Sequence, residues 1–150
     1  MREMDVQLAQ LLPIMQEQLA AGKNVTFSPR GVSMLPMLRQ GVDRVTLSPV
    51  SGRLKKYDLP LYRMDTGKFI LHRIVAVGDI YTCRGDNTYR DELGLRHDQM
   101  IGVVSAFTRG DRMISVENWG YKLYCRVWVT AYPLRNFVRR AVGWLKRRLK

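Results

Sequence analysis

The stretch KFILHRIVAVGDIYTCRGDN covers residues 68–87 and combines two apolar runs with two turn signals. Residues 68–77 form the longer run, and its β-branched and aromatic side chains favour a strand. Gly78-Asp79 is typical of a turn, and residues 80–83 form a second short run after it. The stretch therefore predicts two strands joined by a tight turn.

Further short runs of this kind lie on both sides of that stretch, at residues 24–28, 44–48, 59–64, 100–107 and 113–116. Turn residues separate the runs at 65–67, 85–87 and 110–111. Strands at this density, with no long helix between them, predict an antiparallel β-domain. We expect residues 23–116 to form this β-core.

Helical patterns flank the predicted core, which makes the expected fold mostly β (α+β), in a single domain over residues 1–150. Residues 1–22 are expected to contain an N-terminal helix, with apolar residues at Leu8, Leu11, Leu12, Met15 and Leu19. Pro13 is expected to kink this helix or to start a second one. Residues 121–130 fit a strand or a helix, and we treat 117–133 as strand or connection.

The net charge of +12 is concentrated at the C-terminal end. Residues 134–150 predict an amphipathic helix whose apolar residues form one stripe and whose basic residues fill the other face. Three interpretations remain open for it: a solvated face, a membrane-surface helix and a nucleic-acid-binding element. Nucleic acid is disfavoured because the chain has no recognisable reading motif.

The hydrophobic runs and the cysteines limit the kinds of protein to which the chain can belong. No run approaches the ~18 apolar residues of a membrane span, and the N-terminus lacks a secretory signal. We therefore expect a cytoplasmic protein and leave open peripheral attachment to the inner face of the membrane. Cys83 and Cys125 lack ligand partners at metal spacing, so no metal or other cofactor is expected.

Three segments carry residues suited to chemistry. Ser33 lies in the turn Gly31-Val32-Ser33-Met34-Leu35-Pro36, which can present a hydroxyl beside backbone N–H donors. His72 lies within an apolar strand and is suited to accept a serine proton near neutral pH. Asp86, Asp91 and Glu92 compete to be the carboxylate that orients this histidine.

Taken in this order, the segments resemble the superfamily of signal peptidase I and LexA-like serine peptidases. The similarity runs from about residue 25 to residue 107. It rests on Gly31 to Pro36, Gly41 to Val45, His72 to Val75 with Gly78-Asp79, Gly85 to Asn87, and Ile101 to Val104. Histidine at position 72 resembles the endoplasmic-reticulum-type and archaeal branch, whereas bacterial members have lysine there.

The resemblance implies a Ser-His mechanism with Ser33 as nucleophile and His72 as base. It implies an aspartate in or just after the Gly-Asp-Asn box as the third group, and we expect Asp91 in that role, with Asp86 holding the turn. Gly31 stands where many members have a serine, so Gly31, Ser33 and Met34 would form a nucleophile turn that relies on backbone donors. No membrane anchor precedes the serine, and the chain resembles a minimal core.

The expected function is therefore a serine endopeptidase that cleaves a leader or signal peptide. Two alternatives remain from other classes. The same fold could bind peptides or regulate without cutting, or the basic chain could be a nucleic-acid-binding regulator. A membrane surface, contacted through the C-terminal helix, is an expected additional partner.

Overall fold

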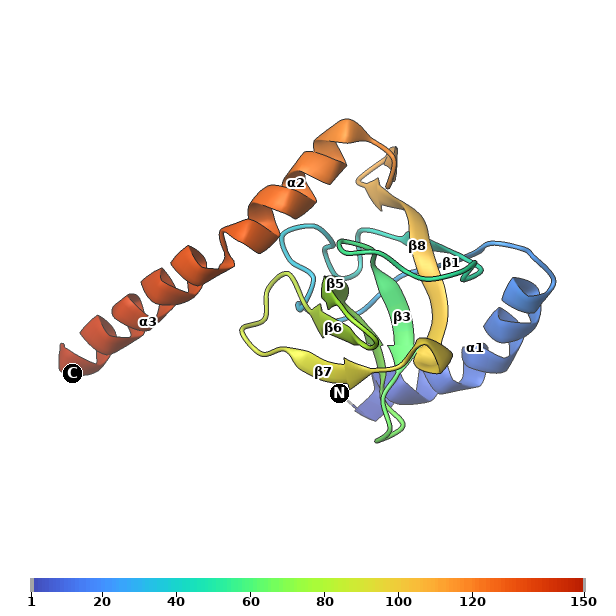
Figure 1. Ribbon diagram of the computed structural model, residues 1–150, viewed down its shortest axis with the longest axis horizontal. Coiled ribbons are helices and arrows are strands. Elements are labelled where there is room, and N and C mark those ends of the chain that lie inside the picture. The colour runs from blue at the N-terminus through green and yellow to red at the C-terminus, as the bar shows by residue number, and fades with distance from the viewer. Residues whose placement is uncertain (1, 150) are drawn as a thin grey trace.

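The computed structural model describes residues 2–149 and contains two β-sheets with helices at both ends of the chain (Figure 1). The elements are α1 (Arg2–Ala20), β1 (Val25–Phe27), β2 (Val45–Ser48), β3 (Pro60–Arg63), β4 (Phe69–Leu71), β5 (Arg73–Val77), β6 (Tyr81–Arg84), β7 (Glu92–Leu95), a 3₁₀ turn (His97–Gln99), β8 (Met100–Arg109), β9 (Arg112–Ser115), α2 (Trp119–Thr130) and α3 (Tyr132–Arg148). All strand pairs are antiparallel. The prediction of a mostly β, antiparallel fold with helices at both ends is confirmed.

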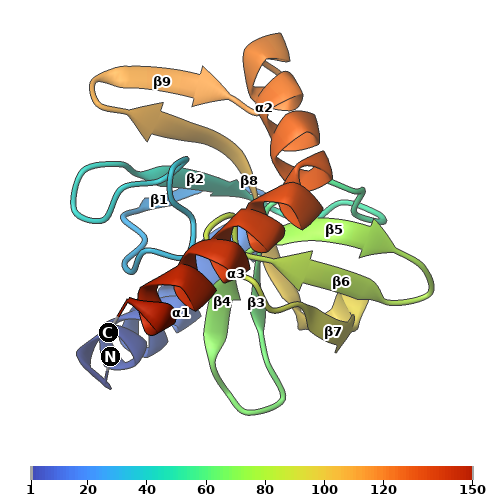
Figure 2. The ribbon, with the colours of Figure 1, turned by 90° about the vertical axis from the view of Figure 1, so that its left-hand side faces the viewer.

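The strands divide between a larger and a smaller sheet, which Figure 2 shows side by side. The larger sheet has the order β1-β2-β8-β3-β4, with β9 also paired to β8. The smaller sheet has the order β5-β6-β7. Strand β4 is the last strand of the larger sheet, and the next strand along the chain, β5, begins the smaller one.

The predicted strand 68–77 is therefore interrupted at its centre. His72 separates β4 from β5, and the chain passes at this residue from one sheet to the other. Ile74 on β5 is fully buried among residues of β3 and β6, whereas β4 pairs with β3 in the larger sheet. His72 thus lies where the two sheets meet, and its position is fixed by strands on both sides.

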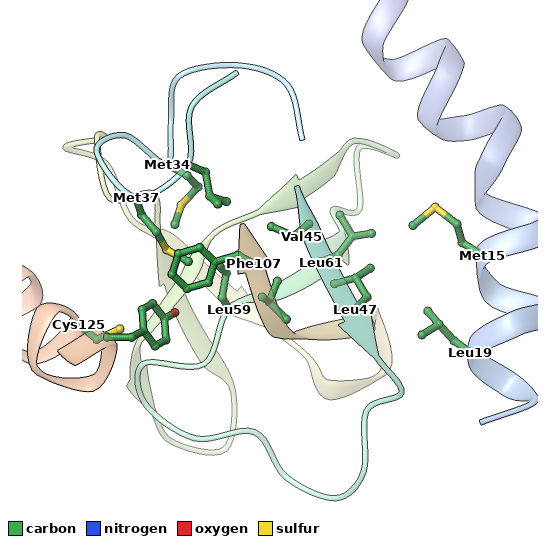
Figure 3. Close-up of a cluster of buried hydrophobic side chains, with 13 residues drawn as sticks. Met15, Leu19, Met34, Met37, Val45, Leu47, Leu59, Leu61, Phe107 and Cys125 are labelled. Carbon is green, nitrogen blue, oxygen red and sulfur yellow. The ribbon is translucent and has the colours of Figure 1, made fainter. Parts of the chain in front are cut away.

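One buried cluster joins the larger sheet to both ends of the chain (Figure 3). Met15 and Leu19 of α1 pack on one side of the sheet residues Leu47 and Leu61. Met34 and Met37 reach the same core from the loop that carries Ser33. The loop is thereby anchored by apolar side chains, since burying one such residue contributes ~1.5–3 kcal/mol.

The flanking helices differ from expectation in three details. Helix α1 is one continuous element that contains Pro13. Leu11, one of the apolar residues that indicate this helix, is exposed and does not pack against the core. Helix, one of the two alternatives for residues 121–130, is confirmed, whereas strand or connection for 117–133 is wrong because α2 occupies most of that segment. Asn118 caps α2 by accepting a hydrogen bond from the Tyr121 N–H. Among the described helices, none is both long and apolar enough to cross a bilayer.

Candidate active site

Ser33 and His72 line the same pocket, which has a volume of about 750 Å³. Its walls come from the nucleophile turn at residues 29–34, from β4 with the flanking Lys68 and His72, from Leu38, and from Asn87-Thr88. Residues 39 positions apart in the sequence are therefore brought to one cavity by the β4–β5 junction. The pairing of Ser33 with His72 that the sequence predicts is compatible with this placement.

Ser33 and His72 both lie close to Gly85. A Cβ placed on Gly85 would lie 2.7 Å from the Ser33 carbonyl oxygen and 2.8 Å from His72 Nε2. Both atoms therefore border the same small space, which only a residue without a side chain leaves free. Within the described residues, the Ser33 hydroxyl and His72 make no hydrogen bond, and catalytic hydrogen bonds often tighten only when substrate binds.

The carboxylate that contacts His72 is Glu92. Its Oε2 lies 2.9 Å from His72 Nδ1, and both side chains are largely buried. A hydrogen bond at Nδ1 leaves Nε2, the nitrogen that faces Gly85 and the Ser33 loop, free to accept a proton. The choice of Asp91 for this contact is wrong: Asp91 instead binds Arg84, with Nη2 to Oδ2 at 3.0 Å.

Strand geometry explains why position 92 and not 91 supplies the carboxylate. Glu92 is the first residue of β7 and lies opposite Cys83 of β6, so its side chain faces the sheet junction. Asp91 precedes the strand, and its carboxylate binds Arg84 of β6 instead of His72. Tyr62, buried beside Cys83 and Glu92, has its pKa raised by that burial and stays a neutral phenol there.

Asp86 has a different partner and holds the loop, as expected. Its carboxylate accepts two hydrogen bonds from Arg73, at 2.8 and 2.9 Å, and a third from the Tyr124 hydroxyl at 2.7 Å. Arg73 is completely buried, and its guanidinium also donates to the Tyr121 hydroxyl and Cys125 Sγ of α2. The pair thus joins the box at 85–87 to α2.

Each residue of the Gly-Asp-Asn box has a separate contact at the site. Gly85 allows the close approach of Ser33 and His72, and Asp86 forms the buried pair with Arg73. The Asn87 N–H donates to the Ser33 carbonyl at 2.8 Å, and its side chain donates to the Val32 carbonyl at 3.1 Å. The box therefore clamps the nucleophile turn from one side while Met34 anchors it in the core on the other.

The nucleophile turn departs from expectation at Gly31. Its N–H donates to Gln40 Oε1 at 2.8 Å and so is already occupied. Its φ of +88° is the conformation for which glycine is suited. Met34 is buried, so its side chain supports the turn and does not contribute to the pocket chemistry. This leaves the backbone at Ser33 as the remaining expected source of an oxyanion donor.

Several residues of α2 and α3 support the site and were missed by the sequence reading. Trp128 Nε1 donates to the Asp86 carbonyl at 2.7 Å, and Arg135 donates to the same carbonyl at 3.3 Å. Tyr121, Tyr124, Cys125 and Trp128 recur at helical spacing, which is a signal for one packed helix face. That spacing was available in the sequence and favours helix over strand for residues 121–130.

Among the side chains that the structure describes, those of residues 8–149, no group of three or more His, Cys, Asp or Glu gathers as metal ligands would. The two cysteines are free and buried, and burial raises the pKa of Cys83 to about 12. Neither thiol is therefore suited to act as a nucleophile at neutral pH.

A scan of the chain against protein-family models finds no match, and a search of curated protein sequences finds no significant match. Ser33 and His72 line one pocket, and Glu92 contacts His72 from outside the residues that line it.

Proposed function

We propose that the protein is a serine peptidase of the signal-peptidase type, with Ser33 as nucleophile, His72 as general base and Glu92 as the residue that orients His72. The observation that carries the proposal is the hydrogen bond between Glu92 and His72 Nδ1 beside the pocket shared with Ser33. It is the arrangement of a base held by a third group that activates a serine hydroxyl.

The reaction follows from these positions. Ser33 Oγ attacks the carbonyl carbon of a peptide bond while His72 Nε2 takes the hydroxyl proton. Glu92, hydrogen-bonded at Nδ1, stabilises the imidazolium that results. The imidazolium then gives its proton to the leaving amine, and the C–N bond breaks. Water attacks the Ser33 ester through the same base, releasing the carboxylic acid and restoring the serine.

The pocket walls support a peptide as the substrate. Strand β4 is the last strand of its sheet and runs directly into His72, so an extended chain could add to it by backbone hydrogen bonds. Phe69 and Leu71 of β4, with Val32 and Leu38, supply an apolar lining for side chains. A leader segment that is extended before cleavage fits such an edge.

Reaction with a biotinylated fluorophosphonate tests the nucleophile. We expect the full chain to be labelled and both Ser33→Ala and His72→Ala to lose labelling by at least ~100-fold. Ser51→Ala, which removes an exposed serine remote from the pocket lining, is the matched control and should label normally.

A mixture of synthetic peptides analysed by mass spectrometry then tests cleavage near neutral pH. Products that depend on Ser33 support the peptidase. If the wild-type chain neither labels nor cuts any peptide, the proposal fails and the fold is better described as a peptide-binding module.

A further inference from the structure

Helices α2 and α3 share an apolar stripe that faces away from the rest of the protein. Its members are exposed and recur every three or four residues within each helix, with one gap of seven at the junction of the helices: Trp119, Leu123 and Val127 on α2, and Leu134, Val138, Val142, Leu145 and the C-cap Leu149 on α3. The side chain of Leu134 is 65% exposed and that of Val138 is 51% exposed. Figure 1 shows α3 projecting from the β-core, with no sheet beside its outer half.

The opposite face of the two helices is already bound to the protein. On α2, Tyr121 and Cys125 are buried and Trp128 donates to Asp86. At the start of α3, Arg84 stacks on the Tyr132 ring at 3.4 Å, and Arg135 donates to the carbonyls of Asp86 and Trp128. These contacts fix the rotation of the helices, so the apolar stripe cannot turn inward.

A stripe of this kind is uncommon on a free surface. Soluble chains expose isolated apolar residues, whereas a continuous row of large ones marks a surface that another phase or molecule covers. In α3 the row adds Phe137 and Trp144, which are 70% and 51% exposed. The stripe is therefore an interaction surface, and charge identifies its partner.

All charges on this segment are positive. Residues 119–150 contain nine Lys or Arg and no Asp or Glu. A second copy of the same helices would bring like charges together, which opposes self-association. Nucleic acid would match the charge but offers nothing to cover the apolar stripe. A bilayer that contains anionic lipids matches both the positive charge and the apolar stripe. Its headgroups attract the basic residues, and the acyl boundary takes up the apolar side chains.

We propose that α2 and α3 form an arm that binds the surface of an anionic membrane, with the apolar stripe in the interface and Arg140 and Arg147 among the headgroups. Both arginines are exposed, and their long side chains can reach toward the headgroups while the stripe is immersed. Trp144 is suited to the same depth, since its ring is apolar and its N–H is polar. The arm lies on the surface and does not span.

The arm also positions the pocket. Arg135 and Trp128 hold the Asp86 carbonyl, and the neighbouring Asn87 holds the Ser33 carbonyl. The root of the arm is thus linked to the nucleophile turn through Asp86 and Asn87, two neighbouring residues of one loop. A membrane-bound arm would keep the pocket next to the bilayer surface, where leader segments of membrane-directed peptides are presented. This last consequence rests on the proposed peptidase function, whereas membrane binding itself does not.

Vesicle flotation of the full chain tests the arm. The probes are vesicles of phosphatidylcholine alone and vesicles with about one quarter phosphatidylglycerol. We expect binding to the anionic vesicles, with Val138→Gln combined with Leu145→Gln lowering the partition coefficient at least ~10-fold. Arg140→Gln combined with Arg147→Gln should lower it roughly 10-fold or more. Tryptophan emission should shift to the blue on binding, and Trp119→Phe combined with Trp144→Phe should remove most of that shift.

The matched control is Val77→Gln combined with Ile80→Gln, which replaces two exposed apolar residues outside the arm. This variant should bind like the wild type, and so should Ser33→Ala, so a failed peptidase test would leave this result intact. Circular dichroism checks that every variant is folded. Equal binding by the stripe variant and the control, or equal binding to neutral and anionic vesicles, overturns the proposal. A dimer in sedimentation that the stripe variant abolishes, or salt-dependent DNA retention without vesicle binding, overturns it as well.

Discussion

Glu92 Oε2 lies 2.9 Å from His72 Nδ1, while its neighbour Asp91 is bound to Arg84. Two adjacent carboxylates, one just before β7 and one at its first residue, thus bind different partners. One bond orients the proposed base, and the other ties the loop before β7 to β6. Substituting each carboxylate in turn therefore gives two matched variants, of which the Glu92 variant should lose far more activity.

Replacing Glu92 by Gln should lower kcat/KM by about 10²- to 10⁴-fold. The amide keeps the size of the side chain but loses the negative charge that stabilises the imidazolium. The amide can also hold His72 in the wrong tautomer. Asp91→Asn should change kcat/KM by less than ~10-fold, because it alters only the contact with Arg84. Steady-state cleavage of a peptide found in the mass-spectrometric screen measures both. Equal losses in the two variants would contradict the assignment.

Replacing Gly85 by Ala should inactivate the protein and destabilise it by about 1–3 kcal/mol. The added methyl group would meet the Ser33 carbonyl, His72 Nε2 and the Thr88 methyl, all closer than 3.0 Å. Gly78→Ala is the control, because its nearest new contact is an ordinary 3.8 Å from the Ile80 carbonyl. Fluorophosphonate labelling and urea unfolding provide the measurements, and normal labelling of the Gly85 variant would refute the geometry.

Replacing Asp86 by Asn should reduce the free energy of unfolding by about 3–5 kcal/mol. The change removes the charge that neutralises Arg73, which is completely buried and cannot reach water. Urea denaturation followed by fluorescence measures the loss. Asp91→Asn breaks a more exposed pair with Arg84 and should cost about 1 kcal/mol or less. A cost for Asp86→Asn as small as that would show that the buried pair is not what holds the box.

The stability of the protein should fall in acid partly through Asp43. Hydrogen bonds from the Arg39 side chain, and then from backbone N–H groups of Gly110 and Arg39, hold the pKa of Asp43 well below its usual range. A carboxyl with a lowered pKa contributes its full stability above the unfolded value of ~3.9 and loses it as the pH falls toward the folded pKa.

Asp43→Asn should therefore be less stable than the wild type at pH 7, by about 2 kcal/mol. Because the wild type loses the same contribution below about pH 4, the difference in stability between the wild type and Asp43→Asn should narrow there. Urea midpoints at neutral and acidic pH measure it. Asp111→Asn, at an exposed position in the neighbouring turn, is the control and should show no such pH-dependent difference. A gap that is constant with pH would contradict the role of the Asp43 charge.

Local signals in the sequence predict the secondary structure of most of the chain and the side chains available for chemistry. Alternation at residues 44–48 and 100–107 and the turn at 78–79 are local signals, because side-chain period and turn preference depend on neighbouring residues. The order of Ser33, His72 and the Gly-Asp-Asn box predicts the class of reaction that is proposed above. The apolar and basic faces of residues 134–150 were likewise visible from spacing alone.

Which of these residues meet depends on how distant parts of the chain pack together. The break at His72, the choice of Glu92 over Asp91 and the burial of Arg73 depend on how two sheets and α2 pack, and such contacts join residues far apart in the sequence. The direction of the C-terminal stripe was decided in the same way. Asp86 and Arg84 hold the polar face of the arm, so its apolar face is turned outward.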